Sequence, residues 1–162
     1  MLSREKTVEL LKRAIELSED AVKNGNTPFA ALLVDKDGNI LLEQENNQIS
    51  ENSIMGHAES ALIQKAGKLY SKDFLWNCTI IASAEPCAMC SGAIFWSNIG
   101  NVAFAMSEKK LRDIIEDKNS PNFDLPCAEV ISRGNKDIKV TGPYEEVEDL
   151  AASIHEEYWN KN

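Results

Sequence analysis

The spacing of apolar residues predicts that the chain begins with a helix. Within residues 5–24 the apolar side chains recur at helical intervals, at Val8, Leu11, Ile15 and Val22. Gly25-Asn26 follows, and glycine is a common residue just beyond the end of a helix. This segment is therefore expected to lie as an amphipathic helix against a core.

Two apolar runs follow the first helix and predict a β-hairpin. Residues 29–34 and 40–42 are separated by the turn-rich residues 35–39. Both runs are apolar at successive positions, which is typical of strands that are covered on both faces. Because helical patterns stand before and after these runs, helices are expected to supply the cover.

The middle of the chain continues the alternation. A helix is expected over about 57–68, with Ala58, Ala61, Leu62 and Leu69 facing inward. Residues 79–82 predict a buried strand, and Pro86 suits the first turn of the next helix because its missing N–H group costs nothing there. A short strand at 102–105 and a polar helix over 107–116 follow.

The last third is less regular. Residues 117–126 are loop-like, 129–131 and 138–140 are possible strands, and Gly142-Pro143 is a break. A final helix carries its apolar residues at Val147, Leu150, Ala151, Ile154 and Tyr158. The pattern predicts one α/β domain spanning residues 1–162, a three-layer αβα sandwich with a central mixed sheet of about five strands.

Composition supports a folded protein and limits its partners. The 162 residues are 43% hydrophobic and 27% charged, which suits about one ordinary domain. The first residues are charged, and no apolar run reaches the length of about 18 residues that a membrane span needs. We therefore expect a cytoplasmic protein with neither a signal peptide nor a membrane partner.

The charge balance disfavours nucleic acid as a partner. The formal net charge is -9, and the densest basic group is only Lys109, Lys110 and Arg112. Proteins that bind polyphosphate usually gather lysine and arginine on one face. Residues 145–157 are strongly acidic instead.

A cysteine pair behind a proline is the strongest chemical motif. In residues 85–90 (EPCAMC), Cys87 and Cys90 lie three positions apart at the start of a predicted helix, where free N–H groups favour thiolates. His57 is the plausible third ligand, and three protein ligands leave a catalytic zinc one position for water. Glu59 lies two residues beyond His57 and is expected to serve that water as general acid and base.

Other interpretations remain open for the cysteines taken alone. The spacing of Cys87 and Cys90 also suits a structural zinc site or a redox pair. A structural site needs a fourth protein ligand, and Cys78, Cys127 and His155 show no recognisable spacing to the pair. Cys78 is expected to pack in a buried strand, Cys127 either packs or contacts substrate, and His155 is expected on a solvated acidic face.

The combined motifs resemble a known superfamily. His-x-Glu followed by Pro-Cys-x-x-Cys is a signature of zinc deaminases that act on cytosine or adenine rings. The chain resembles the cytidine deaminase-like superfamily, in its branch of guanine, cytosine and tRNA adenosine deaminases. Residues 85–96 (EPCAMCSGAIFW) and 27–31 (TPFAA) are similar to bacterial guanine deaminases. The chain departs from the family at Ala30, where glycine is common, and over 107–134.

The resemblance implies a set of substrate contacts. Phe29 and Trp96 would wall the base pocket, and Asn46, eleven residues before His57, would bond the edge of the base. From the residues alone, Phe29 and Trp96 equally suit core positions, and a turn is an alternative role for Asn46.

Further contacts follow from the same resemblance. Ala58 belongs to the implied substrate-binding set, and carbonyl groups near Ser83 or Ala84 would meet the leaving amino group. Near the C-terminus, Trp159 is the expected lid over the pocket, whereas Tyr158 is expected to pack on its own subunit.

The resemblance also implies a reaction and an assembly. The expected reaction is zinc-dependent hydrolytic deamination of a free nucleobase, guanine first, with one Zn²⁺ per chain and a homodimer. The alternatives are a deaminase of cytosine or of another nucleobase or nucleoside, a tRNA adenosine deaminase, and a structural zinc module without catalysis.

Overall fold

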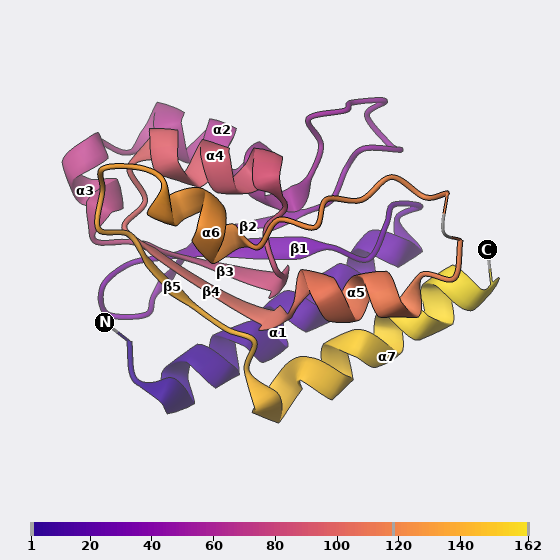
Figure 1. Cartoon of the computed structure of the whole chain (residues 1–162). Coiled ribbons are helices and arrows are strands. Elements are labelled where there is room, and N and C mark those ends of the chain that lie inside the picture. Colours follow the sequence, from indigo (N-terminus) through magenta and orange to yellow (C-terminus); the bar gives the residue numbers. More distant parts are fainter. Residues whose placement is uncertain (1, 118, 162) are drawn as a thin grey trace.

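The computed structural model describes residues 2–117 and 119–161, which form an open mixed sheet between two layers of helices (Figure 1). The strands are β1 (Ala30–Val34), β2 (Ile40–Glu45), β3 (Thr79–Ala84), β4 (Asn101–Met106) and β5 (Lys139–Thr141). The helices are α1 (Arg4–Lys23), α2 (Ala58–Leu69), α3 (Lys72–Trp76), α4 (Ala88–Ser97), α5 (Glu108–Ile114), α6 (Cys127–Ser132) and α7 (Glu145–Lys161). The predicted three-layer α/β fold with a five-stranded sheet is confirmed.

The sheet combines an antiparallel hairpin with a parallel half. Its strand order is β2-β1-β3-β4-β5, in which β1 is antiparallel to β2 and β3 while β3, β4 and β5 are parallel. The register pairs Ala31 with Ala82 and Ala84 with Met106. One end of the sheet therefore combines the carboxyl ends of β3 and β4 with the amino end of β1.

The alternation of side chains along β1 explains why the whole run is apolar. Ala30, Leu32 and Val34 point into a core shared with α1 and α7, whereas Ala31 and Leu33 point into a second core shared with α2, α4 and α6. All five residues are buried because each face of the strand has its own helical cover. Figure 1 shows these two helical layers on opposite sides of the sheet.

Hydrogen bonds from backbone N–H groups to serine side chains fix several helix starts. Ser3, Ser71 and Ser107 each precede a helix and accept a backbone N–H from three residues further on.

Among the described helices, none combines the length and the apolar character needed to cross a membrane.

Four local predictions were wrong. Residues 129–131 lie in helix α6 instead of a strand, and the short helix α3 was not predicted. β2 is an edge strand, so it is not covered on both faces and Ile40 is 43% exposed. Leu69, at the end of α2, is also exposed because the helix ends there.

Gly100 stands where no side chain fits. A Cβ at this position would lie 2.0 Å from the carbonyl oxygen of Trp76. We expect Gly100→Ala to lower the free energy of unfolding by about 2 kcal/mol, because a backbone must move. Gly67 in α2 is the control, since nothing lies within 4 Å of its added Cβ. Gly67→Ala should raise stability by about 0.5–1 kcal/mol. Urea denaturation of both variants is the measurement, and equal effects would contradict it.

Candidate metal and catalytic site

Two helix N-termini bring the predicted ligands together at the end of the sheet where β3 and β4 finish and β1 begins. His57 is the N-cap residue of α2, and Cys87 is the N-cap residue of α4. Neither side chain caps its own helix, so both are available for other contacts. Cys90 follows one turn into α4 and is fully buried.

The spacing of the three side chains suits zinc. The Nδ1 atom of His57 lies 3.5 Å from the sulfur of Cys87 and 3.6 Å from the sulfur of Cys90. Zinc–sulfur and zinc–nitrogen bonds of ordinary length at a tetrahedral angle place such atoms about 3.6 Å apart. Within the described residues, this trio is the group that could hold a metal ion. Cys78, Cys127 and His155 do not join it, so residues 2–117 and 119–161 supply no fourth protein ligand for a closed site.

Of the three candidate ligands, Cys87 is the one whose surroundings already favour the charge that a metal needs, because metals bind thiolates and neutral imidazoles. A hydrogen bond from the Cys90 thiol, together with His57, lowers the pKa of Cys87 to about 4. The bond to Cys87 raises the pKa of His57, against the opposing effect of burial. In the metal-free protein, Cys90 keeps its proton because its pKa is raised by the same bond and by burial.

Glu59 lies beside the trio without belonging to it. It is in the first turn of α2, and its side chain is 7% exposed. Burial raises the pKa of its carboxyl group to about 7, and the side chain interacts with Cys90. A buried carboxyl that titrates near neutral pH can both accept and return a proton.

Phe29, Ala58 and Ser83, which are predicted substrate contacts, lie near the same end of the sheet. Phe29 is half-buried and directly precedes β1, and its carbonyl oxygen accepts the backbone N–H of Asn46 at 2.8 Å. Ala58 is buried at the start of α2. The Ser83 hydroxyl accepts the backbone N–H of Ala30 at 3.0 Å, so it closes the end of the β1–β3 ladder.

Asn46 and Trp96, the other two predicted contacts of the base, lie in different surroundings. The side chain of Asn46 accepts the backbone N–H of Gln48 and donates to the Gln48 side chain, as a turn residue does. Trp96 lies near the end of α4, is 76% exposed and packs edge-to-face on Phe95. The substrate contacts proposed for both residues stay predictions.

The environment of His155 was predicted wrongly. The residue is 1% exposed instead of lying on a solvated face, because α7 turns it toward the sheet, where its ring meets Phe29 edge-on at 4.9 Å. Its Nδ1 accepts the indole N–H of Trp159 at 3.1 Å, and the ring donates to the carbonyl of Pro28. The candidate lid Trp159 is therefore tied to the loop before β1.

His155 gives a pH-dependent stability that can be measured. Burial lowers its pKa from 6.5 to about 4. Above about pH 6.5 the ring is neutral in the folded and in the unfolded chain. Between about pH 6.5 and about pH 4 the ring is protonated in the unfolded chain but stays neutral in the folded chain. The stabilisation is thus present above the unfolded pKa and is lost as the pH falls toward the folded pKa.

We expect the wild type to lose about 2 kcal/mol more stability than His155→Gln between about pH 7 and about pH 5. Chemical denaturation at both pH values measures the difference. Parallel pH profiles for the two proteins would show that His155 titrates normally.

Two side chains near the trio escaped the sequence interpretation. Glu85 was noted only as a family residue, yet its carboxylate accepts backbone N–H groups from Glu108 and Cys127. Burial, with the negative charges of Glu85 and Cys87, raises the pKa of Glu108 to about 7. No local pattern indicates these contacts, since the partners are 23 and 42 residues from Glu85.

The remaining cysteines are buried. Cys78 is 1% exposed, and burial raises its pKa to about 11, as expected for packing in the core. Cys127 is fully buried at the start of α6, and burial raises its pKa to about 12. The packing interpretation of Cys127 is the one that its surroundings favour.

A mixed α/β sheet with a His-Cys-Cys trio and an adjacent buried carboxyl defines a zinc-binding protein with an open coordination position. The model of the cytidine and deoxycytidylate deaminase zinc-binding region matches residues 4–106. The chain belongs to this family, and zinc is its cofactor. Its members are hydrolytic deaminases, and deamination of a nucleobase or nucleoside is the activity of the chain.

Individual relatives differ in the substrate that their names give. A probable cytosine deaminase of Schizosaccharomyces pombe is 32% identical over 96% of this chain and 94% of that protein. A guanine deaminase of Bacillus subtilis is 42% identical over 59% of this chain and 61% of that protein. A solved guanine deaminase of Nitrosomonas europaea shares the fold, with a TM-score of 0.78 at 23% identity, covering 99% of this chain and 86% of that one.

Proposed function

We propose that the protein deaminates a free nucleobase and releases ammonia and the corresponding oxo base. Guanine is the preferred candidate substrate. The observation that carries the reaction is the trio of His57, Cys87 and Cys90 with the buried Glu59 beside it. Guanine is supported by the 42% identity to the Bacillus subtilis guanine deaminase over 96 residues.

Each residue of the site has a distinct part in this reaction. The trio would hold zinc through one nitrogen and two sulfurs, and zinc when bound supplies a Lewis acid that lowers the pKa of a coordinated water. Glu59 takes a proton from the attacking water and delivers it to the ring nitrogen of the base. It then takes the remaining proton of the added hydroxyl group and delivers it to the amino group, so that the carbon–nitrogen bond breaks, ammonia leaves and the carbonyl of the product forms.

Cytosine is the second candidate substrate. It is favoured by the probable cytosine deaminase of Schizosaccharomyces pombe, which matches nearly the whole chain.

Purified protein should contain about one zinc per chain, as one trio requires. Ammonia release should then be compared for guanine, cytosine, adenine, their nucleosides and a tRNA. Preference for guanine supports the proposal, and preference for cytosine or tRNA adenosine overturns the choice of substrate.

A homodimer is the proposed assembly. Large apolar side chains stand exposed near the ends of α4 and in the loop before α2: Met89 at 37%, Trp96 at 76% and Ile54 at 84%. Burial of such side chains against a second chain would remove an apolar surface from water. Light scattering of the purified protein measures the mass, and a monomer at all concentrations would refute the assembly.

A further inference from the structure

One carboxylate joins the metal-binding loop to two distant helices. Glu85 stands two residues before Cys87, and its Oε1 accepts the backbone N–H of Cys127 at 2.8 Å. Its Oε2 accepts the backbone N–H of Glu108 at 2.9 Å. Cys127 is the first residue of α6 and Glu108 the first of α5. The two oxygens of one side chain therefore hold the two ends of segment 108–127.

The bond to Cys127 replaces a cap that the local sequence lacks. Pro126 is the N-cap residue of α6 and makes no side-chain capping bond. Glu85 supplies the missing acceptor from 42 residues away. A hydrogen bond to an ionised carboxylate is about twice as strong as one between neutral groups. The start of α6 thus depends on a residue of the metal-binding loop.

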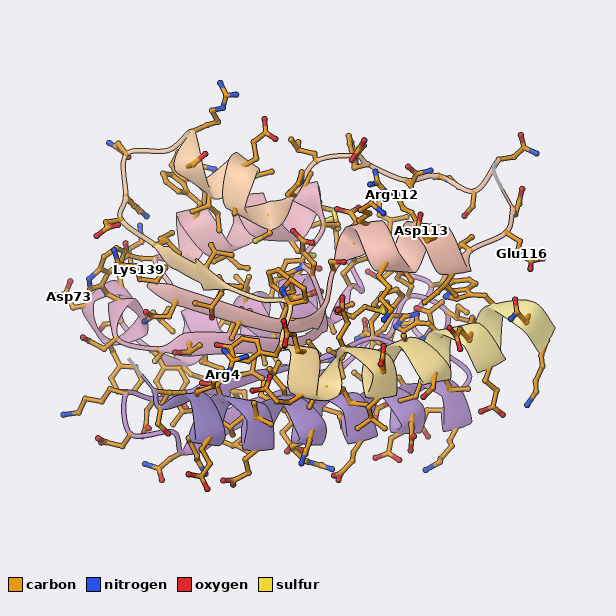
Figure 2. The ribbon with its side chains drawn as sticks, turned by 60° about the horizontal axis from the view of Figure 1, so that its bottom comes forward. Arg4, Asp73, Arg112, Asp113, Glu116 and Lys139 are labelled. Carbon is orange, nitrogen blue, oxygen red and sulfur yellow. The ribbon has the colours of Figure 1, made fainter. Side chains whose placement is uncertain are left out.

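The segment between the two helix starts is also tied to itself. The guanidinium of Arg112 in α5 forms an ion pair with Asp124 at 2.6 Å. Figure 2 shows Arg112 on the side of α5 that faces the chain leading to α6. The loop that leaves α5 therefore folds back along that helix. The two ends of segment 108–127 remain bound to Glu85.

This arrangement places segment 108–127 beside the metal ligands. The Ser91 hydroxyl in α4 donates to the Pro86 carbonyl at 3.1 Å, and the Cys127 thiol interacts with Ser91. Glu108, whose backbone N–H is held by Glu85, begins this segment. Its Oε2 atom is buried and has no hydrogen-bond partner among the described residues. The two ends of segment 108–127 therefore lie against residues 85–91, which carry both cysteine ligands.

We propose that Glu85 is a positioning residue that holds both ends of segment 108–127 against the metal-binding loop and so fixes one wall of the substrate pocket. The inference rests on the proposed deaminase function for its kinetic consequence. It assigns to Glu85 an effect on substrate affinity, separate from the holding of zinc by the trio.

The variant Glu85→Gln tests this role at nearly constant size. Glutamine keeps one acceptor oxygen and turns the other into an NH₂ group that would face a backbone N–H donor. We expect hydrogen exchange at the amide of Glu108 or Cys127 to become at least about tenfold faster, because a bond to a charged acceptor is lost. KM should rise about tenfold while zinc content is unchanged and kcat falls less than about threefold, because a misplaced wall weakens binding.

Asp35→Asn is the matched control. The Oδ1 atom of Asp35 also accepts two backbone N–H groups, from Asp37 and Asn39 at 2.9 Å each. This carboxylate lies in the β1–β2 turn, away from the trio. Its replacement should speed exchange within residues 35–39 alone and leave KM unchanged.

Several outcomes would overturn the assignment. An unchanged KM despite faster exchange would show that the wall does not depend on Glu85, and unchanged exchange would show that the two bonds do not hold the segment. Loss of zinc would show that Glu85 supports the metal ligands instead. If wild-type protein releases no ammonia from any tested base, the proposed function fails, and the holding of segment 108–127 is then decided by exchange at the two amides.

Discussion

The variant Glu59→Gln is expected to keep its zinc and to lose activity by a factor of about 10²–10⁴ in kcat. Glutamine has nearly the size of glutamate and fits the same buried position in the first turn of α2. It cannot accept a proton from water or return one to a leaving amine. Ammonia release under saturating base and zinc content per chain are the two measurements.

The control for this variant is Glu9→Gln, which makes the same chemical change in an exposed ion pair with Lys6 on α1. Its kcat should equal that of the wild type. A zinc-loaded Glu59→Gln protein that deaminates at the normal rate would remove Glu59 from the reaction. Loss of zinc from Glu59→Gln would instead make it a supporting residue of the trio.

Removing one metal ligand should abolish both zinc binding and activity. Cys90→Ala leaves only His57 and Cys87, and two ligands do not hold zinc against dialysis in a site built for three. Wild-type protein kept in free zinc at about one hundred times the Kd should lose about 2.7 kcal/mol of unfolding free energy when a chelator removes the zinc. The variant, which has no metal to lose, should not respond to the chelator.

Cys78→Ala is the matched control, because Cys78 and Cys90 are both thiols that are at most 1% exposed. Cys78 lies outside the trio, so its loss should cost only packing energy, about 1 kcal/mol, and leave zinc content unchanged. Thermal unfolding with and without chelator compares the proteins. A Cys90→Ala protein that retains one zinc per chain would contradict the assignment of the ligands.

The strongly patterned parts of the fold could be predicted from the sequence. In β1 and β3, every residue is buried, and the apolar runs of these strands carry that information directly. The chemistry at Cys87, Cys90 and His57 could be predicted because it depends on spacing along the chain and on few residue types. Their spatial convergence then follows from helix starts at one edge of the sheet.

Elsewhere, contacts from distant residues decided the structure. Val130 and Ile131 suit a strand locally, yet the start of α6 is held by Glu85, and Ile131 packs in the core below α4. In the same way, the five-residue helix α3 is too short to show a helical period. His155 was misplaced because acidic neighbours outweighed a signal that was present, its spacing of four residues from buried Ala151.

The two edges of the sheet restrict how copies of the protein can meet. β2 places Glu43 and Glu45 along one edge, and Glu43 is already paired with Arg13. β5 offers only three residues, of which Lys139 is charged. Charged and very short edge strands discourage the addition of further strands. Growth into a continuous intermolecular sheet is therefore disfavoured at both edges, and the proposed homodimer would have to form through the helical faces.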